Sequence, residues 1–172
     1  MSREHIDLFF KEQSDLLLFL TERNEISLVI SATDNFRRSF LLAVASYFEH
    51  EVSQIIRDVP VKHAAGNALL SALVENKAVS RQYHTYFDWD KLNANKFFAS
   101  FGDECKEKFV KRTRDPEFKD CVNAFLQIGQ SRNRLVHRNF VEFDVEKTPE
   151  EIYFLFEKAL IFVKYIRDSL LN

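Results

Sequence analysis

The chain has 172 residues, a formal net charge of −2 and 46% hydrophobic residues, with only three glycines and three prolines. This hydrophobic content excludes a disordered chain, and the length fits one domain over residues 1–172. The charge excludes a protein that attracts nucleic acid by an overall positive field, so any RNA binding must use local patches. Because strand-rich folds use many Gly and Pro in turns, we expect an all-α bundle of five to seven helices.

The cysteines and the N-terminal residues indicate where the protein works. Cys105 and Cys121 have no metal-binding spacing and form no disulfide framework. The N-terminal residues lack an apolar signal core, and the longest apolar run, residues 16–20, is too short to cross a bilayer. We therefore expect a cytoplasmic protein without membrane contact, metal or cofactor.

The first third of the chain predicts two long helices. Apolar residues recur at helical spacing over residues 4–30, and residues 33–35 (T-D-N) predict a break with a new N-cap. A second helix is expected to end at Pro60. A shorter third helix over residues 64–78 is expected to turn Leu69, Leu70, Leu73 and Val74 inward.

Residues 79–91 have no helical period and predict an ordered loop anchored by aromatic residues. The spacing of His84, Asp88 and Asp90 in this loop matches no known metal site. We interpret the two aspartates as surface carboxylates beside the aromatic anchors. Short helices are predicted over residues 93–101, ending at Gly102, and over residues 103–111. The basic run that follows, residues 111–114 (K-R-T-R), is typical of a solvated turn.

Asp115, Pro116 and Glu117 predict the start of a long helix, with Asp at the N-cap and Pro at the first helical position. One stripe of this helix is apolar until Gly129 and Arg132 interrupt it. A glycine inside a helix indicates close approach by another backbone, and an arginine on such a stripe requires a partner or a ligand. The last helix is predicted to start at a capping box over residues 148–151 and to run to residue 170; it is apolar on nearly every side, so it lies centrally or in a subunit interface.

The segment R-N-R-L-V-H carries the candidate chemistry, with Arg132 and His137 separated by four residues and Asn133 directly after the arginine. Residues five apart on a helix differ by about 140° in direction, so Arg132 and His137 of one copy do not stack on each other. A two-fold dimer that packs these helix ends together would place two of each in one cleft. That arrangement suits metal-independent RNA cleavage, with one His137 as base, the other as acid and Arg132 on the phosphate.

A second pair with similar spacing, Arg57 and His63, contains Pro60 and is discounted because a helix break is expected there. Five further residues are candidate phosphate contacts that would position RNA without reading its sequence: Arg134, Arg138, Lys111, Arg112 and Arg114. On the second helix, Glu49 is a candidate supporting residue, with a solvated helix face as the plainer interpretation.

The R-N-R-L-V-H block on the penultimate long helix resembles the HEPN superfamily (higher eukaryotes and prokaryotes nucleotide-binding). The segments S-F-L-L-A-V-A-S-Y-F-E and N-A-N-K-F-F-A-S-F-G are similar to its RiboL-PSP-HEPN branch. The resemblance implies a dimeric helical bundle whose catalytic forms are metal-independent endoribonucleases of toxin–antitoxin and anti-phage systems. It assigns the catalytic motif to Arg132, Asn133 and His137, and implies RNA (tRNA or mRNA), a second copy and an antitoxin or other defence-system protein as partners.

One departure from the family concerns control of the activity. Family toxins that are silenced by nucleotidyltransferases carry a tyrosine two residues after the motif histidine, where this chain has Asn139. Three alternatives stay open: a non-catalytic module that binds a protein or nucleic acid, a nucleotide-binding subunit that works with a separate transferase, and a motif that only caps and cross-links a helix end.

Overall fold

The computed structural model describes residues 2–137 and 144–172. The expected all-α fold is confirmed: apart from one isolated bridge between Asp88 and Asn93, the described residues form no β-structure. Their elements are α1 (Arg3–Glu22), α2 (Ile26–His63), α3 (Ala68–Val74), the π-helical turn η1 (Glu75–Val79), α4 (Tyr83–Tyr86), α5 (Asn95–Ala99), α6 (Asp103–Arg112), α7 (Pro116–His137) and α8 (Pro149–Leu171). The described chain thus has four long helices and several short ones between α2 and α7.

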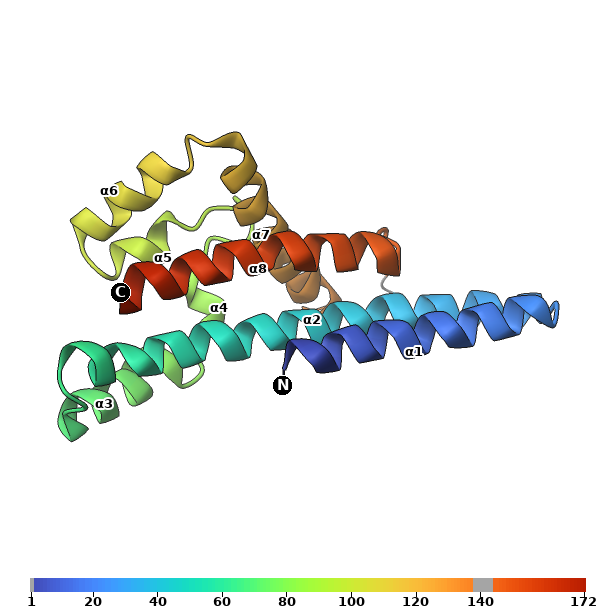
Figure 1. The fold of residues 1–172 in the computed structure, drawn as a ribbon, viewed down its shortest axis with the longest axis horizontal. Coiled ribbons are helices and arrows are strands. Elements are labelled where there is room, and N and C mark those ends of the chain that lie inside the picture. Colours follow the sequence, from blue (N-terminus) through green and yellow to red (C-terminus); the bar gives the residue numbers. More distant parts are fainter. Residues whose placement is uncertain (1, 138–143) are drawn as a thin grey trace.

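The long helices form the frame of the molecule (Figure 1). Helices α1 and α2 make an antiparallel hairpin, and α8 lies along the middle of α2. Helix α7 packs against both α8 and α2, while α5 and α6 pack on each other. Helix α6, which precedes α7, lies far from the tip of the α1–α2 hairpin, whereas α7 itself crosses the centre of the fold (Figure 1).

The boundary between the first two helices was predicted wrongly. The chain turns at Asn24, which has the left-handed φ of 57° that asparagine tolerates, and not at residues 33–35. Residues 33–35 continue α2, and the Thr33 hydroxyl donates to the Val29 carbonyl at 2.7 Å inside the helix instead of capping a new one. The helix also continues through Pro60 to His63, so the predicted stop at Pro60 is three residues too early.

The predicted starts of α7 and α8 are confirmed. Pro116 is the first residue of α7, and the backbone N–H of Glu117 donates to the Asp115 carboxylate at 3.0 Å. At α8, the Thr148 hydroxyl accepts from the Glu151 N–H at 3.2 Å and the Glu151 carboxylate accepts from the Thr148 N–H at 2.7 Å. Short-range hydrogen bonds of this kind depend only on neighbouring residues, which is why the sequence predicts them well.

The core is largely aromatic, and α8 is its centre. Phe156 and Phe162 of α8 are fully buried, and their rings lie 5.5 Å from Phe48 of α2 and 5.1 Å from Phe125 of α7, respectively. Phe154 on the outer side of α8 is 60% exposed, so the helix is central without being covered all round. None of the helices in the described part of the chain combines the length and the apolar character needed to cross a membrane.

Helix α3 does not bury the leucines expected to face inward. Leu69 is 83% exposed, Leu70 44% and Leu73 55%. The reason is positional: α3 has only seven residues and contacts the end of α2 and η1, so no element covers its outer side.

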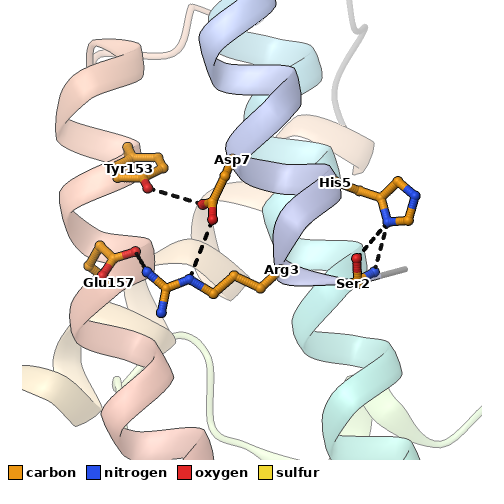
Figure 2. A network of polar contacts seen from close by, with 6 residues as sticks. All are labelled: Ser2, Arg3, His5, Asp7, Tyr153 and Glu157. Atoms are coloured by element: carbon orange, nitrogen blue, oxygen red, sulfur yellow. Dashed lines mark hydrogen bonds and ion pairs between the residues drawn. The ribbon is translucent and has the colours of Figure 1, made fainter.

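The first turn of α1 is held to α8 by a group of polar contacts (Figure 2). The Arg3 guanidinium is 2.7 Å from the Glu157 carboxylate and 3.5 Å from Asp7, and the Tyr153 hydroxyl donates to Asp7 at 3.0 Å. Burial and the hydrogen bond to Asp7 raise the pKa of Tyr153. These contacts lie at the surface, so they orient α1 while the buried rings supply most of the stability.

Candidate functional site

The motif occupies the last turns of α7, where the buried stripe of that helix reaches the surface. Phe118, Val122 and Phe125 on this stripe are buried, whereas the Arg132 side chain is 32% exposed and Val136 is 53% exposed. The stripe therefore brings the Arg132 guanidinium to the edge of the core, where solvent and an anionic ligand can reach it.

Within the described part of the chain, two side chains contact the Arg132 guanidinium. Its Nη1 donates to the Asn133 amide oxygen at 3.2 Å, and its Nη2 lies 3.7 Å from a carboxylate oxygen of Glu49 on α2. The Glu49 side chain is 44% exposed. The structure thus brings together three residues predicted from the sequence: Arg132, Asn133 and Glu49.

For the predicted catalytic histidine, the structure describes the backbone alone. His137 is the last residue of α7, but its side chain lies outside the described residues. Arg138, predicted to contact phosphate, and Asn139, whose identity departs from the family pattern, also lie outside them.

Gly129, one turn before Arg132, has a specific packing role. A Cβ atom at this position would lie 2.0 Å from Cζ3 of Trp89, so only glycine leaves room for the indole ring. The prediction of close approach was right, but the approaching group is a side chain and not a backbone. The loop that contains Trp89 is therefore held directly against the motif end of α7.

Gln130 adds polar contacts between the same two elements. Its side-chain amide donates to the Trp89 carbonyl at 3.1 Å and to the Asp90 carbonyl at 3.4 Å. The Trp89 indole N–H donates to the His84 carbonyl at 3.0 Å. Trp89 and Phe87 are 8% and 3% exposed, which confirms the predicted aromatic anchors. The segment is not wholly a loop as predicted, because Tyr83–Tyr86 form the short helix α4.

Tyr83 is a residue of this region that sequence reasoning missed. It is partly buried, its ring lies 5.6 Å from that of Trp89, and it interacts electrostatically with Glu49 and Arg132. Burial is the main cause that raises the pKa of its hydroxyl; Glu49 raises the pKa further, whereas Arg132 lowers it. A tyrosine hydroxyl is protonated at neutral pH even without this shift, so Tyr83 adds an uncharged hydroxyl that interacts electrostatically with Arg132 and Glu49. No sequence signal distinguishes Tyr83 from the other aromatic anchors of the loop.

A pocket of about 380 Å³ opens between this loop and α7. Its lining residues are Phe87, Asp88, Trp89, Asp90, Lys96 and Asn133. Asn133 belongs both to this lining and to the motif, where its amide oxygen accepts a hydrogen bond from Arg132. Asp88 and Asp90 thus contribute to a pocket, and among the described residues no group of three or more His, Cys, Asp or Glu side chains is arranged to hold a metal.

The predicted basic residues fall in two places. Arg134 is exposed on the last turn of α7, within the R-N-R-L-V-H segment. The run of residues 111–114 precedes the other end of α7, where the first residue, Pro116, is about 24 Å from Arg132 by the helical rise of 1.5 Å per residue. Lys111 and Arg114 are exposed, whereas Arg112 pairs with Asp115 at 2.8 Å and covers the Phe118 ring. Within one copy of the chain, residues 111–114 therefore lie too far from Arg132 to contact the same phosphate.

The discounted pair, Arg57 and His63, has structural roles. The Arg57 guanidinium makes two bonds to Glu75, at 2.8 and 3.2 Å, and the His63 ring lies 2.6 Å from the Leu170 carbonyl. Both residues belong to α2, so the expected helix break was the wrong reason for discounting them. Their side chains are instead used to hold η1 and the end of α8.

Comparisons with known proteins identify one family. A family model described as RiboL-PSP-HEPN matches residues 7–172, which covers nearly the whole chain. Neither a search of curated proteins nor a search of solved structures finds a match. The family indicates a nuclease or another RNA-related function in general terms.

Proposed function

Because the chain belongs to the RiboL-PSP-HEPN family, we propose that it is a metal-independent endoribonuclease of a toxin–antitoxin or anti-phage defence system. Arg132, Asn133 and His137 are the proposed catalytic residues, in a composite active site formed by two copies of the chain. RNA is the substrate, and the proposed place of action is the cytoplasm.

The chemistry is transesterification at phosphorus. The 2′-oxygen of a ribose attacks the adjacent phosphate, forms the 2′,3′-cyclic phosphate and breaks the bond to the 5′-oxygen of the next nucleotide. One His137 takes the proton of the 2′-hydroxyl, and His137 of the partner subunit gives a proton to the leaving 5′-oxygen. Arg132 neutralises the charge that accumulates on the non-bridging oxygens, and Asn133 holds the guanidinium in place.

The observation that carries this proposal is the state of Arg132. Its side chain is 32% exposed and its contact with Glu49 is a single one at 3.7 Å. The structural arginine Arg57, in contrast, is bound by Glu75 through two short bonds, at 2.8 and 3.2 Å. A loosely paired guanidinium at the surface can exchange its contact for a phosphate, whereas a fully bonded one cannot do so without loss.

Surface hydrophobic residues support the dimer on which the mechanism depends. Val136, directly before His137, is 53% exposed. Further exposed apolar side chains lie on the α1–α2 hairpin, including Phe19 at 48% and Ile26 at 70%. Apolar surface of this kind is typical of contacts between subunits.

The test is cleavage of total RNA and tRNA by the purified protein with EDTA present. We expect wild-type protein to cut, and His137→Ala and Arg132→Ala to lose at least about 100-fold in rate while remaining folded, because general acid–base catalysis contributes about 10²–10⁴-fold. His50→Ala and Arg23→Ala are matched controls, because His50 is exposed on α2 and Arg23 lies at the hairpin tip.

Three results would contradict the proposal. Folded dimeric wild-type protein that cuts no RNA would favour the non-catalytic binding module. Cutting that survives both motif substitutions would assign the activity to other residues. In a bacterial host, wild-type protein that arrests growth no more strongly than the His137→Ala variant would argue against a toxin.

A further inference from the structure

The pocket beside the motif has the features of a preorganised binding site. Its volume of about 380 Å³ is at the lower end of the range for small-ligand sites, about 300–1,000 Å³. Phe87 and Trp89 are the aromatic residues of its lining, and Asp88, Asp90, Lys96 and Asn133 are the polar ones. A single aromatic base matches both this size and this mixture of surfaces.

The wall of the pocket is rigid. The Phe87 ring is stacked on Phe97 at 4.9 Å, and Trp89 is wedged against Gly129 and bonded to the His84 carbonyl. Asp88 is held by two backbone hydrogen bonds with Asn93, at 2.9 and 3.0 Å. A site with fixed walls and fixed backbone binds its ligand with little ordering cost.

The polar groups of the pocket retain unused hydrogen-bonding capacity. The Asp88 carboxylate accepts from the Lys91 N–H at 3.2 Å and lies 3.6 Å from the Lys91 ammonium, which leaves other lone pairs available. Within the described part of the chain, the Asp90 carboxylate and the Lys96 ammonium have no ion-pair partner. The pocket therefore offers carboxylate acceptors together with one cationic donor.

We propose that this pocket binds a guanine base of single-stranded RNA, next to the phosphate that Arg132 contacts. The inference rests on the proposed function for its position beside a scissile phosphate. Guanine is the RNA base whose Watson–Crick edge carries two neighbouring N–H donors, at N1 and N2, beside the O6 acceptor. The carboxylates of Asp88 and Asp90 match the two donors, and Lys96 matches O6.

The other bases fit this set of groups less well. Adenine and cytosine each offer one amino group beside a ring nitrogen that accepts, and a carboxylate opposite that nitrogen is repelled. Uracil has one N–H between two carbonyl oxygens. Each of these bases would leave a carboxylate of the pocket without a donor, which is costly in a partly desolvated site.

Asn133 connects the base to the chemistry. It lines the pocket and accepts from Arg132 at 3.2 Å, so a base in the pocket and a phosphate at Arg132 are separated by one side chain. The enzyme is therefore expected to cut beside guanosine in unpaired RNA, because a base in a duplex cannot enter the pocket.

The test measures binding without cleavage. Fluorescence anisotropy with EDTA present compares His137→Ala protein on uridine oligonucleotides that contain one central guanosine, inosine or adenosine. We expect the guanosine oligonucleotide to bind about tenfold tighter than the adenosine one, with inosine between them because it lacks the N2 amino group. Asp88→Asn, Asp90→Asn and Lys96→Ala should each reduce the preference to about threefold or less.

Matched controls come from α6. Glu107 and Lys106 are exposed there, and Glu107→Gln and Lys106→Ala should keep the full preference. Asn at position 88 keeps an oxygen that can accept from the Lys91 N–H, so the loop should remain folded. Circular dichroism of each variant checks this.

The outcomes separate this inference from the proposed function. Equal binding of all three oligonucleotides, or a guanosine preference that the three substitutions leave unchanged, overturns the pocket assignment even if wild-type protein cuts RNA. A guanosine preference that depends on Asp88 and Lys96 supports it even if wild-type protein cuts nothing, in which case the proposed function fails and the pocket assignment stands.

Discussion

The contact between Gly129 and Trp89 predicts an unusual response to a Gly→Ala substitution. In an ordinary helix interior this substitution stabilises by about 0.5–1 kcal/mol. Here the new Cβ would lie 2.0 Å from Cζ3 and 2.5 Å from Cε3 of Trp89. The indole cannot move away easily, because it is 8% exposed and its ring packs 5.0 Å from Phe87 and 6.0 Å from Phe125.

The magnitude follows from these opposing effects. Overpacking a buried site costs about 1–3 kcal/mol, so Gly129→Ala should lower the free energy of unfolding by about 1–2 kcal/mol after the helix propensity is counted. At about 2–4 °C per kcal/mol for a chain of this size, the Tm should fall by about 2–8 °C. Urea and thermal unfolding followed by circular dichroism measure both quantities.

A double-mutant cycle identifies the cause. Trp89→Leu removes the ring that meets the new methyl group, so Gly129→Ala made in that background should stabilise by about 0.5–1 kcal/mol instead of destabilising. A Gly129→Ala protein as stable as wild type, or the same loss in both backgrounds, would refute the packing explanation.

Three further predictions concern other parts of the molecule. Glu49→Ala should lower RNA cleavage about tenfold and stability by less than about 1 kcal/mol, since the pair with Arg132 is exposed, and Glu49→Gln should restore part of the rate; unchanged cleavage in both would remove Glu49 from the site. Burial raises the pKa of the Cys121 thiol, so a disulfide reagent at pH 8 should modify Cys121 only on unfolding; fast reaction in the native protein would contradict this. Burial raises the pKa of Tyr86 to about 12, and its hydroxyl donates to the Ala78 carbonyl. The folded state therefore holds the hydroxyl proton more tightly than the unfolded state does. The stability contributed by the protonated Tyr86 is complete below about pH 10, the pKa of the unfolded tyrosine, and is lost as the pH rises through about 12, the pKa of the folded one. Tyr86→Phe should therefore lose less stability than wild type between those pH values, and equal losses would contradict the assignment.

Local signals in the sequence predicted part of the fold well. The caps of α7 and α8 depend on residues within one turn, and both starts were correct. The break at Asn24 was missed because Thr, Asp and Asn occur both at helix caps and inside helices, so the pattern favoured a break at the polar residues 33–35, whereas Asn24 makes the turn. The exposure of Leu69 was missed because periodicity shows which residues share a face, not whether another element covers that face.

The candidate site was predictable along α7 and, from other elements, only at Glu49 of α2. The spacing of Arg132 and Asn133 is local, and the glycine at position 129 correctly indicated a close contact. The contributions from other elements depend on tertiary packing: Glu49 comes from α2, and Trp89 and Asp88 come from a loop without periodicity. Nothing in their own sequence neighbourhoods shows that they meet at the end of α7.

The most direct test of the central claim is the chemical end of the RNA fragments produced with EDTA present. The account predicts 2′,3′-cyclic phosphate and 5′-hydroxyl ends, detected by mass spectrometry, from wild-type protein and not from His137→Ala or Arg132→Ala. Fragments with 5′-phosphate ends, or cleavage that stops when EDTA is added, would contradict a mechanism carried by the side chains of Arg132 and His137.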